Sequence, residues 1–183
     1  MECLLHIAYR LDVSCWQVMK PLEKVSVATR KQKIQKAFRN QTGLTLDVPK
    51  QGCGSSNDRN TARRFFVDSK LTASITGLNE KLFERFSNIL SVISSGLDIN
   101  PEMFTTYCIE TAHEYVEHYG WYKMPSSIHR VLIHRADVVR ASPVAVGTLS
   151  EEPQECRNKD IKKFREYRAR KCSRYSCVHL CVF

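Results

Sequence analysis

The sequence is poor in the residues that interrupt or disorder a chain. It contains 7 glycines and 6 prolines among 183 residues, which argues against a chain dominated by disorder. No apolar run approaches the length that crosses a bilayer, so no membrane partner is expected. The first residues, Glu2 to His6, carry neither a basic stretch nor an apolar core, and no secretory signal is predicted there.

Cysteine, by contrast, is frequent, but its pattern lacks the familiar signatures. Eight cysteines would suit a small secreted scaffold, and a secreted or membrane-surface protein is one alternative. No two of them form a Cys-x-x-Cys arrangement, which removes the local zinc-knuckle and thioredoxin motifs. Reduced thiols in a cytosolic or nuclear protein are the favoured interpretation.

Positive charge is in excess. Lys and Arg number 28 against 19 Asp and Glu, for a formal net charge of +9 and a pI near 9.2. Such an excess favours a polyanionic partner, with nucleic acid first and an acidic membrane surface second. Net charge alone is also compatible with a basic protein that has no such partner.

Apolar side chains recur at helical spacing, whereas strand signals are weak. Helices are expected over residues 3–19, 26–41, 80–94 and 101–119 and from 126 onward, with 144–149 as the one extended candidate. Asn79 and Asn100 are expected to cap two of the helices, and Pro101 suits a first helical position. The sequence therefore predicts a mainly α fold.

Composition divides the chain into five expected regions. They are a basic helical region (1–46), a surface linker rich in Gly, Ser and Asn (47–60), a second helical region (61–148), a basic helix (149–174) and a tail (175–183).

Two histidines in the segment IHRVLIH are candidate metal ligands. His129 and His134 are five residues apart and do not share a face of an ideal α-helix. One metal ion could bind both if the helix ended or tightened near His134. Zinc usually takes four ligands, and no third or fourth is evident nearby. The alternative is a pair of histidines that pack or are solvated at a helix edge.

The segment NDRNTARRFF is a candidate phosphate site. Arg63 and Arg64 follow the predicted linker at an expected helix start, where guanidinium and backbone amide groups suit a phosphate. Phe65 and Phe66 would anchor the segment in the core. A solvated basic turn is the simpler interpretation, and the two are compatible.

The segment from Leu149 to Arg174 begins with glutamates and then turns basic. Ser150 suits an N-cap, and Glu151 and Glu152 suit the first turn of a helix. Glu155 lies four residues before Lys159, a favourable helical pair, so each glutamate also has a structural explanation. Nine bases surround most of this helix, which is unusual without a polyanion to bind. The residues that remain for contact with a core are Ile161, Phe164, Tyr167 and Ala169.

Together these segments resemble a known family. NTARRFF, MPSSIHRVLIH and SEEPQECRNKDIKKFREYRARKCSR, in this order, resemble the C-terminal part of the catalytic core of Transib-type DNA transposases and of the V(D)J recombination-activating endonuclease catalytic subunit. The resemblance extends from about Glu2 to Arg174. It implies the helical portion of an RNase H-like (DDE) core, with the sheet of that core largely missing, in a nuclear protein.

The resemblance also implies roles for individual residues. Such enzymes cut DNA with two aspartates and one glutamate around paired Mg²⁺ or Mn²⁺ ions, and Glu155 stands in the matching Glu-x-x-Asn-Lys context. His129 and His134 match the two histidines of a structural Zn²⁺ site, which places that site in region 61–148. The residues expected to contact DNA are Arg63, Arg64, Arg157, Lys159, Lys162, Lys163 and Arg168.

The chain departs from the family pattern at several points. Neither catalytic aspartate nor the zinc cysteine pair has a match, so DNA binding without cleavage is expected. A non-catalytic nucleic-acid-binding or interaction protein derived from a transposon is the alternative, and a homodimer is left open. Arg59 and Arg135 stand where relatives favour Gly, which would stiffen a turn that needs a positive φ. The tail 175–183 fits nothing in the family.

Overall fold

The computed structural model describes residues 1–50, 54–149 and 152–167 of the chain. It divides into two compact units, Met1–Gly147 and Thr148–Phe183. The described residues are mainly helical, as the sequence predicts. None of the helices among them is both long and apolar enough to span a bilayer.

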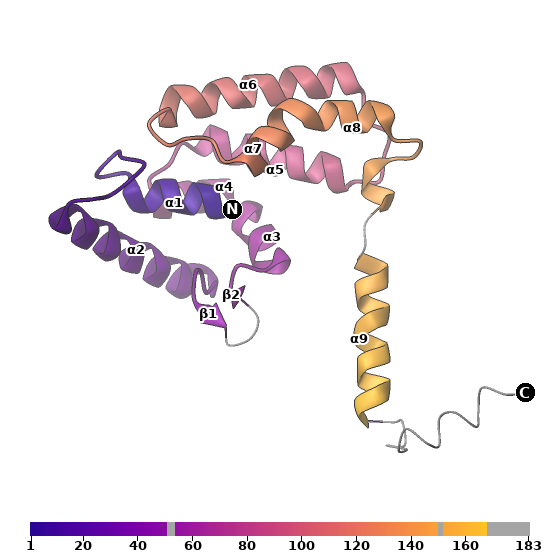
Figure 1. Cartoon of the computed structure of the whole chain (residues 1–183), viewed down its shortest axis with the longest axis horizontal. Helices are drawn as coiled ribbons and strands as arrows, with labels where there is room; N and C mark the ends of the chain where they lie inside the picture. The colour runs from indigo at the N-terminus through magenta and orange to yellow at the C-terminus, as the bar shows by residue number, and fades with distance from the viewer. Residues whose placement is uncertain (51–53, 150–151, 168–183) are drawn as a thin grey trace, which may run out of the picture. The chain divides into compact units, whose positions relative to one another are not determined.

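The first unit contains eight α-helices in its described part (Figure 1). They are α1 (Glu2–Arg10), α2 (Pro21–Thr42), α3 (Arg59–Val67), α4 (Ser69–Thr76), α5 (Glu80–Ser94), α6 (Pro101–Tyr119), α7 (Ser126–His129) and α8 (Arg135–Ala141). A π-helical turn, η1 (Arg130–His134), joins α7 to α8. The 3₁₀ turn η2 (Val146–Leu149) spans the boundary between the two units, and α9 (Glu152–Tyr167) belongs to the second unit.

Several helix boundaries follow the local signals in the sequence. The Asn79 side chain accepts a hydrogen bond from the Leu82 amide at 3.2 Å and begins α5. Asn100 caps α6 in the same way, with Pro101 at the first helical position. The helix expected over residues 3–19 ends earlier, at Arg10. The helix expected over residues 26–41 begins earlier than predicted, at Pro21.

The segment predicted as a linker is tied to the helices around it. It contains the short antiparallel strands β1 (Pro49–Lys50) and β2 (Gly54–Ser55). Asp47 precedes β1, exchanges hydrogen bonds with Asn57 and lies 3.4 Å from the Lys31 ammonium. Burial alone would raise the pKa of Asp47. The hydrogen bond from Asn57, the nearby Tyr9 hydroxyl and the charge of Lys31 outweigh burial and lower that pKa.

The extended conformation expected for residues 144–149 is wrong, because Val146–Leu149 forms a 3₁₀ turn. The reason is a close approach of two backbones. A Cβ on Gly147 would lie 2.4 Å from the backbone nitrogen of Gly96. The absence of a side chain at Gly147 therefore lets the chain turn tightly against the end of α5.

One hydrophobic core joins the helices on both sides of the predicted linker. The rings of Phe38 on α2 and of Phe65, Phe66 and Phe83 from α3 and α5 pack together, with centroids of neighbouring rings 5.2–5.7 Å apart. Helix α1 lies beside α2 and α4, and α6 lies beside α5 and α8 (Figure 1). This core fixes the position of α3 and of the segment η1–α8, which carry predicted site residues.

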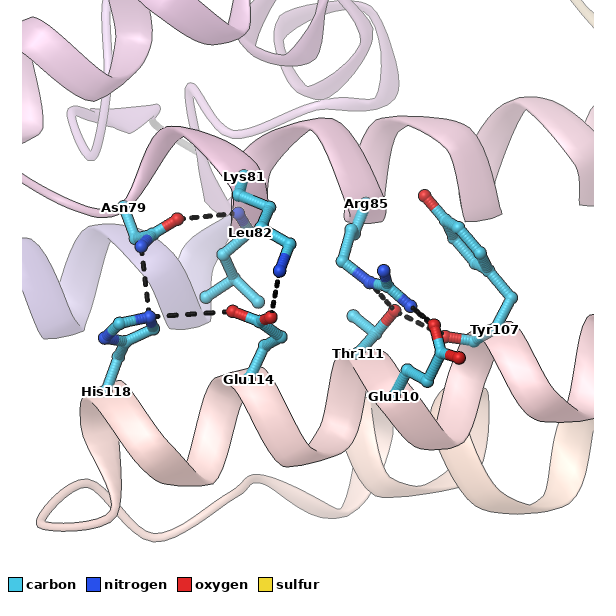
Figure 2. A network of polar contacts seen from close by, with 9 residues as sticks. All are labelled: Asn79, Lys81, Leu82, Arg85, Tyr107, Glu110, Thr111, Glu114 and His118. Atoms are coloured by element: carbon cyan, nitrogen blue, oxygen red, sulfur yellow. Dashed lines mark hydrogen bonds and ion pairs between the residues drawn. The ribbon is translucent and has the colours of Figure 1, made fainter.

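Polar contacts hold α5 against α6 (Figure 2). The Arg85 guanidinium donates to the Thr111 hydroxyl at 2.9 Å and to the Glu110 carboxylate at 2.7 Å, and it stacks on the Tyr107 ring at 4.2 Å. One turn away, the Lys81 ammonium donates to Glu114 and thereby lowers the pKa of that carboxyl. Because η1 and α8 pack on α6, this network indirectly positions the histidine pair.

Candidate nucleic-acid interface and histidine pair

The π-helical turn brings the two candidate histidines together. Residues five apart are rotated by about 140° on an ideal α-helix. A π-helix bonds residue i to residue i+5 and places such residues on one face. The imidazole centroids of His129 and His134 lie 5.2 Å apart, with the rings at 60°. The helix therefore widens between them, whereas the sequence suggested that it would have to end or tighten.

Packing against α6 holds this turn in place. Leu132, within η1, and Ala136, at the start of α8, are buried, whereas both histidines are exposed. Arg135 has φ −67° and continues the helix, and Arg59 is the first residue of α3. Neither position needs a positive φ, so the expectation that arginine would strain a turn there is wrong.

The two histidines would supply two of the four ligands that zinc usually takes. Two neutral imidazoles on one helical face can bind one Zn²⁺ ion. Among the described residues, no group of three or more His, Cys, Asp or Glu side chains could hold a metal ion. Cys3, Cys15 and Cys108 are free thiols in the first unit, and burial raises the pKa of Cys108 to about 11. The remaining ligands of such a site would have to come from elsewhere.

Arg63 and Arg64 face solvent on α3, and Phe65 and Phe66 are buried, as predicted. Asp58 begins the helix by accepting a hydrogen bond from the Thr61 amide at 2.8 Å. The Arg64 guanidinium also donates to the Thr42 carbonyl at 2.6 Å. Arg64 therefore places positive charge at the carboxyl end of α2, where the helix dipole favours it.

The five bases of α2 between residues 30 and 39 form two different sets. Arg30 points inward and donates hydrogen bonds to the Ala8 and Thr76 carbonyls and to Asp12, and Lys31 pairs with Asp47. The outward set, Lys33, Lys36 and Arg39, is exposed. The structural use of Arg30 and Lys31 was not predicted. Composition alone does not distinguish one base on a basic helix from another. The position of Arg30 and Lys31 within the apolar stripe of α2 does distinguish them from the exposed bases.

Helix α9 presents an exposed basic surface. Every side chain from Arg157 to Tyr167 is exposed. Its described bases are Arg157, Lys159, Lys162, Lys163 and Arg165. Lys162 lies 4.0 Å from Glu166, an exposed pair that contributes roughly 0–1 kcal/mol, so this base stays available to a ligand.

The core contact expected for the apolar residues of α9 is not present in its own unit. Ile161, Phe164 and Tyr167 remain 49%, 53% and 82% exposed. Glu155 belongs to α9, and its side chain lies outside the described part of the structure. Arg168 and the expected cap Ser150 are also outside it.

Comparison with models of known protein families finds no match, and neither does a search of curated proteins.

Proposed function

We propose that this protein binds DNA through basic side chains of α9 and α3, and that it corresponds to the helical part of a Transib-type transposase or recombinase core. The observation that carries the proposal is the exposed basic run from Arg157 to Arg165 on α9. Exposed bases exchange condensed counterions for phosphate contacts when they meet DNA. The exposed pair Arg63 and Arg64 adds positive charge on the first unit.

The histidine pair supports the same relationship. In the family that the sequence resembles, two histidines five residues apart bind Zn²⁺. The π-helical turn places His129 and His134 near one another on one side of the helix, as such binding requires. Two further ligands would have to be supplied from outside the described residues. The bound ion would be structural, because it would hold the segment η1–α8 to the chain that supplies those ligands.

DNA cleavage is not expected from this chain alone. In the proposed relationship Glu155 supplies one oxygen ligand to a pair of Mg²⁺ or Mn²⁺ ions, which activate the attacking oxygen and stabilise the leaving one. A single glutamate cannot hold two ions, and the sequence offers no aspartate in a matching context. A nuclear location is part of the proposal. A homodimer is compatible with it.

The second candidate is a nucleic-acid-binding or interaction protein in which Glu155 has no role. It is favoured by the structural explanation available for Glu155, which lies four residues before Lys159 in a favourable helical pair. The two candidates differ in the effect of Glu155→Gln in the presence of Mg²⁺. Reduced Mg²⁺-dependent DNA affinity supports a metal ligand, whereas unchanged affinity supports the non-catalytic protein.

Fluorescence anisotropy with a labelled DNA duplex tests the proposal at several salt concentrations. We expect the double variant Lys159→Gln/Lys163→Gln to reduce the slope of log affinity against log salt by about 1.8, because two phosphate contacts are lost. Lys70→Gln/Lys123→Gln is the control with equal charge, since both lysines are exposed on the first unit. Salt-independent binding contradicts DNA binding, and robust Mg²⁺- or Mn²⁺-dependent nicking contradicts the predicted inactivity.

A further inference from the structure

The outward face of α2 is a second basic surface, which the proposed function does not include. Lys33, Lys36 and Arg39 are exposed on successive turns of this helix. Within the described part of the chain, the side chains of these three residues make no hydrogen bond or ion pair. They lie on the C-terminal half of α2 and are not used in its packing, and we call these three residues the α2 ridge.

Acidic residues are missing from the whole surrounding segment. No Asp or Glu occurs between Lys24 and Leu46, so the α2 ridge has no i, i+3 or i, i+4 acidic partner on its own helix. A solvated helix face usually alternates charges of both signs, which stabilise it through such pairs. An unbroken positive face carries like-charge repulsion that an anionic ligand would relieve.

The inward bases fix the direction in which the ridge points. Arg30 joins α2 to the ends of α1 and α4, and Gln35 donates a hydrogen bond to the Leu46 carbonyl at 2.8 Å. Phe38 is completely buried in the aromatic core. Charged side chains on a helix held at so many points need little ordering of the backbone when a ligand binds.

Arg64 extends the positive surface beyond the end of the helix. Its guanidinium contacts the Thr42 carbonyl, one turn after Arg39. From Lys33 to Thr42 the helix rises about 14 Å, comparable with about four nucleotides at 3.4 Å per strand. Exposed amides of Gln32, Asn40 and Gln41 provide uncharged donors of the kind that contact phosphate oxygens.

We propose that the phosphate backbone of a DNA duplex lies along the α2 ridge and reaches Arg64. This inference rests on the proposed DNA-binding function and adds a contact surface in the first unit, separate from α9. The chemistry is sequence-independent, since lysine and arginine side chains on such a surface contact phosphates and do not read base edges.

The test compares two double variants of the full chain with identical chemistry. Lys33→Gln/Lys36→Gln removes two ridge charges, and Lys70→Gln/Lys123→Gln removes two exposed charges elsewhere in the first unit. Affinity for a labelled 20-base-pair duplex is measured by anisotropy from 50 to 200 mM KCl. We expect the ridge variant to reduce the slope of log affinity against log salt by about 1.8. Over this fourfold change in salt, the variant should therefore lose about 12-fold less affinity than the wild-type chain loses. The control should keep the wild-type slope.

The outcomes separate this inference from the proposed function. If the wild-type chain binds DNA with a steep salt dependence but both double variants match it, the ridge is not a DNA contact and DNA binding through α9 stands. If the wild-type chain binds no DNA, both proposals are wrong. Parallel arms use an RNA duplex and vesicles of anionic phospholipid. A ridge-specific loss confined to either of those ligands also contradicts the proposal, because it assigns the surface to another polyanion.

Discussion

Arg30 is predicted to be a structural residue, although it lies on a basic helix. Its Nε donates to the Ala8 carbonyl at 2.6 Å, and its two terminal nitrogens donate to Asp12 at 2.7 Å and to the Thr76 carbonyl at 3.1 Å. Both carbonyls belong to completely buried residues near the ends of α1 and α4. The perturbation is Arg30→Met, which keeps the aliphatic stem and removes all three donors.

The expected loss of stability can be worked out bond by bond. The Thr76 carbonyl loses a charged donor without a replacement, which costs about 2 kcal/mol. The Ala8 carbonyl retains the Leu11 amide at 3.4 Å, so its loss costs about 1 kcal/mol. Asp12 is 52% exposed, and its ion pair adds at most about 1 kcal/mol. We therefore expect Arg30→Met to lower the free energy of unfolding by about 3–4 kcal/mol.

Urea unfolding followed by tryptophan fluorescence measures this loss. Both tryptophans, Trp16 and Trp121, lie in the first unit beside Tyr122, so the signal reports on the core that Arg30 supports. Lys33→Met is the control and should change stability by less than about 0.5 kcal/mol, because its side chain is exposed. A stability loss below about 0.5 kcal/mol for Arg30→Met would refute the assignment.

Two further predictions concern Asp47 and the histidine pair. The pKa of Asp47 is lowered by its surroundings, so the stability that it contributes is present above about pH 4 and is lost as the pH falls through the folded-state pKa. The test variant is Asp47→Asn, because asparagine tolerates the left-handed backbone at this position (φ 51°). We expect it to lower the free energy of unfolding by about 1–2 kcal/mol at pH 7 and to weaken the dependence of stability on pH, measured by urea unfolding between pH 7 and 3. An unchanged pH profile would contradict this prediction. For the histidine pair, titration calorimetry should show Zn²⁺ binding, and His129→Ala or His134→Ala should each weaken the Zn²⁺ affinity by about 100-fold. The control is His113→Ala, a histidine exposed on α6, which should leave the affinity unchanged. Equal effects of all three substitutions would exclude chelation by the pair.

Much of the fold could be predicted because its signals are local. Asn79 and Asn100 cap helices through their own side chains, and those bonds involve residues two or three positions away. The special role of Arg30 and Lys31 also had a local signal. They lie between Val27 and Ile34 at spacings of three and four, on the apolar stripe of α2. A base within such a stripe is directed at the core, so it must find buried acceptors or a carboxylate.

The features that could not be predicted depend on contacts between distant segments. Gly147 turns tightly because it meets Gly96, and the position of Asp47 is fixed by Tyr9, Lys31 and Asn57. The periodicity of apolar residues cannot predict such pairs, since it describes one segment of the chain at a time. The sequence therefore located the charged and metal-binding candidates but not the internal partners that decide which of them remain free.

The histidine pair shows how a spacing rule depends on the helix that it assumes. Five residues separate His129 from His134, and on an α-helix this spacing argues against a shared ligand. Burial of Leu132 against α6 in a π-helical turn reverses that argument, because the same spacing then brings the two rings within 5.2 Å of each other. Local propensity did not indicate the wider turn, whereas packing on α6 supports it. A five-residue histidine spacing within a helix that packs on one side should therefore be assessed as a candidate π-turn before metal binding is rejected.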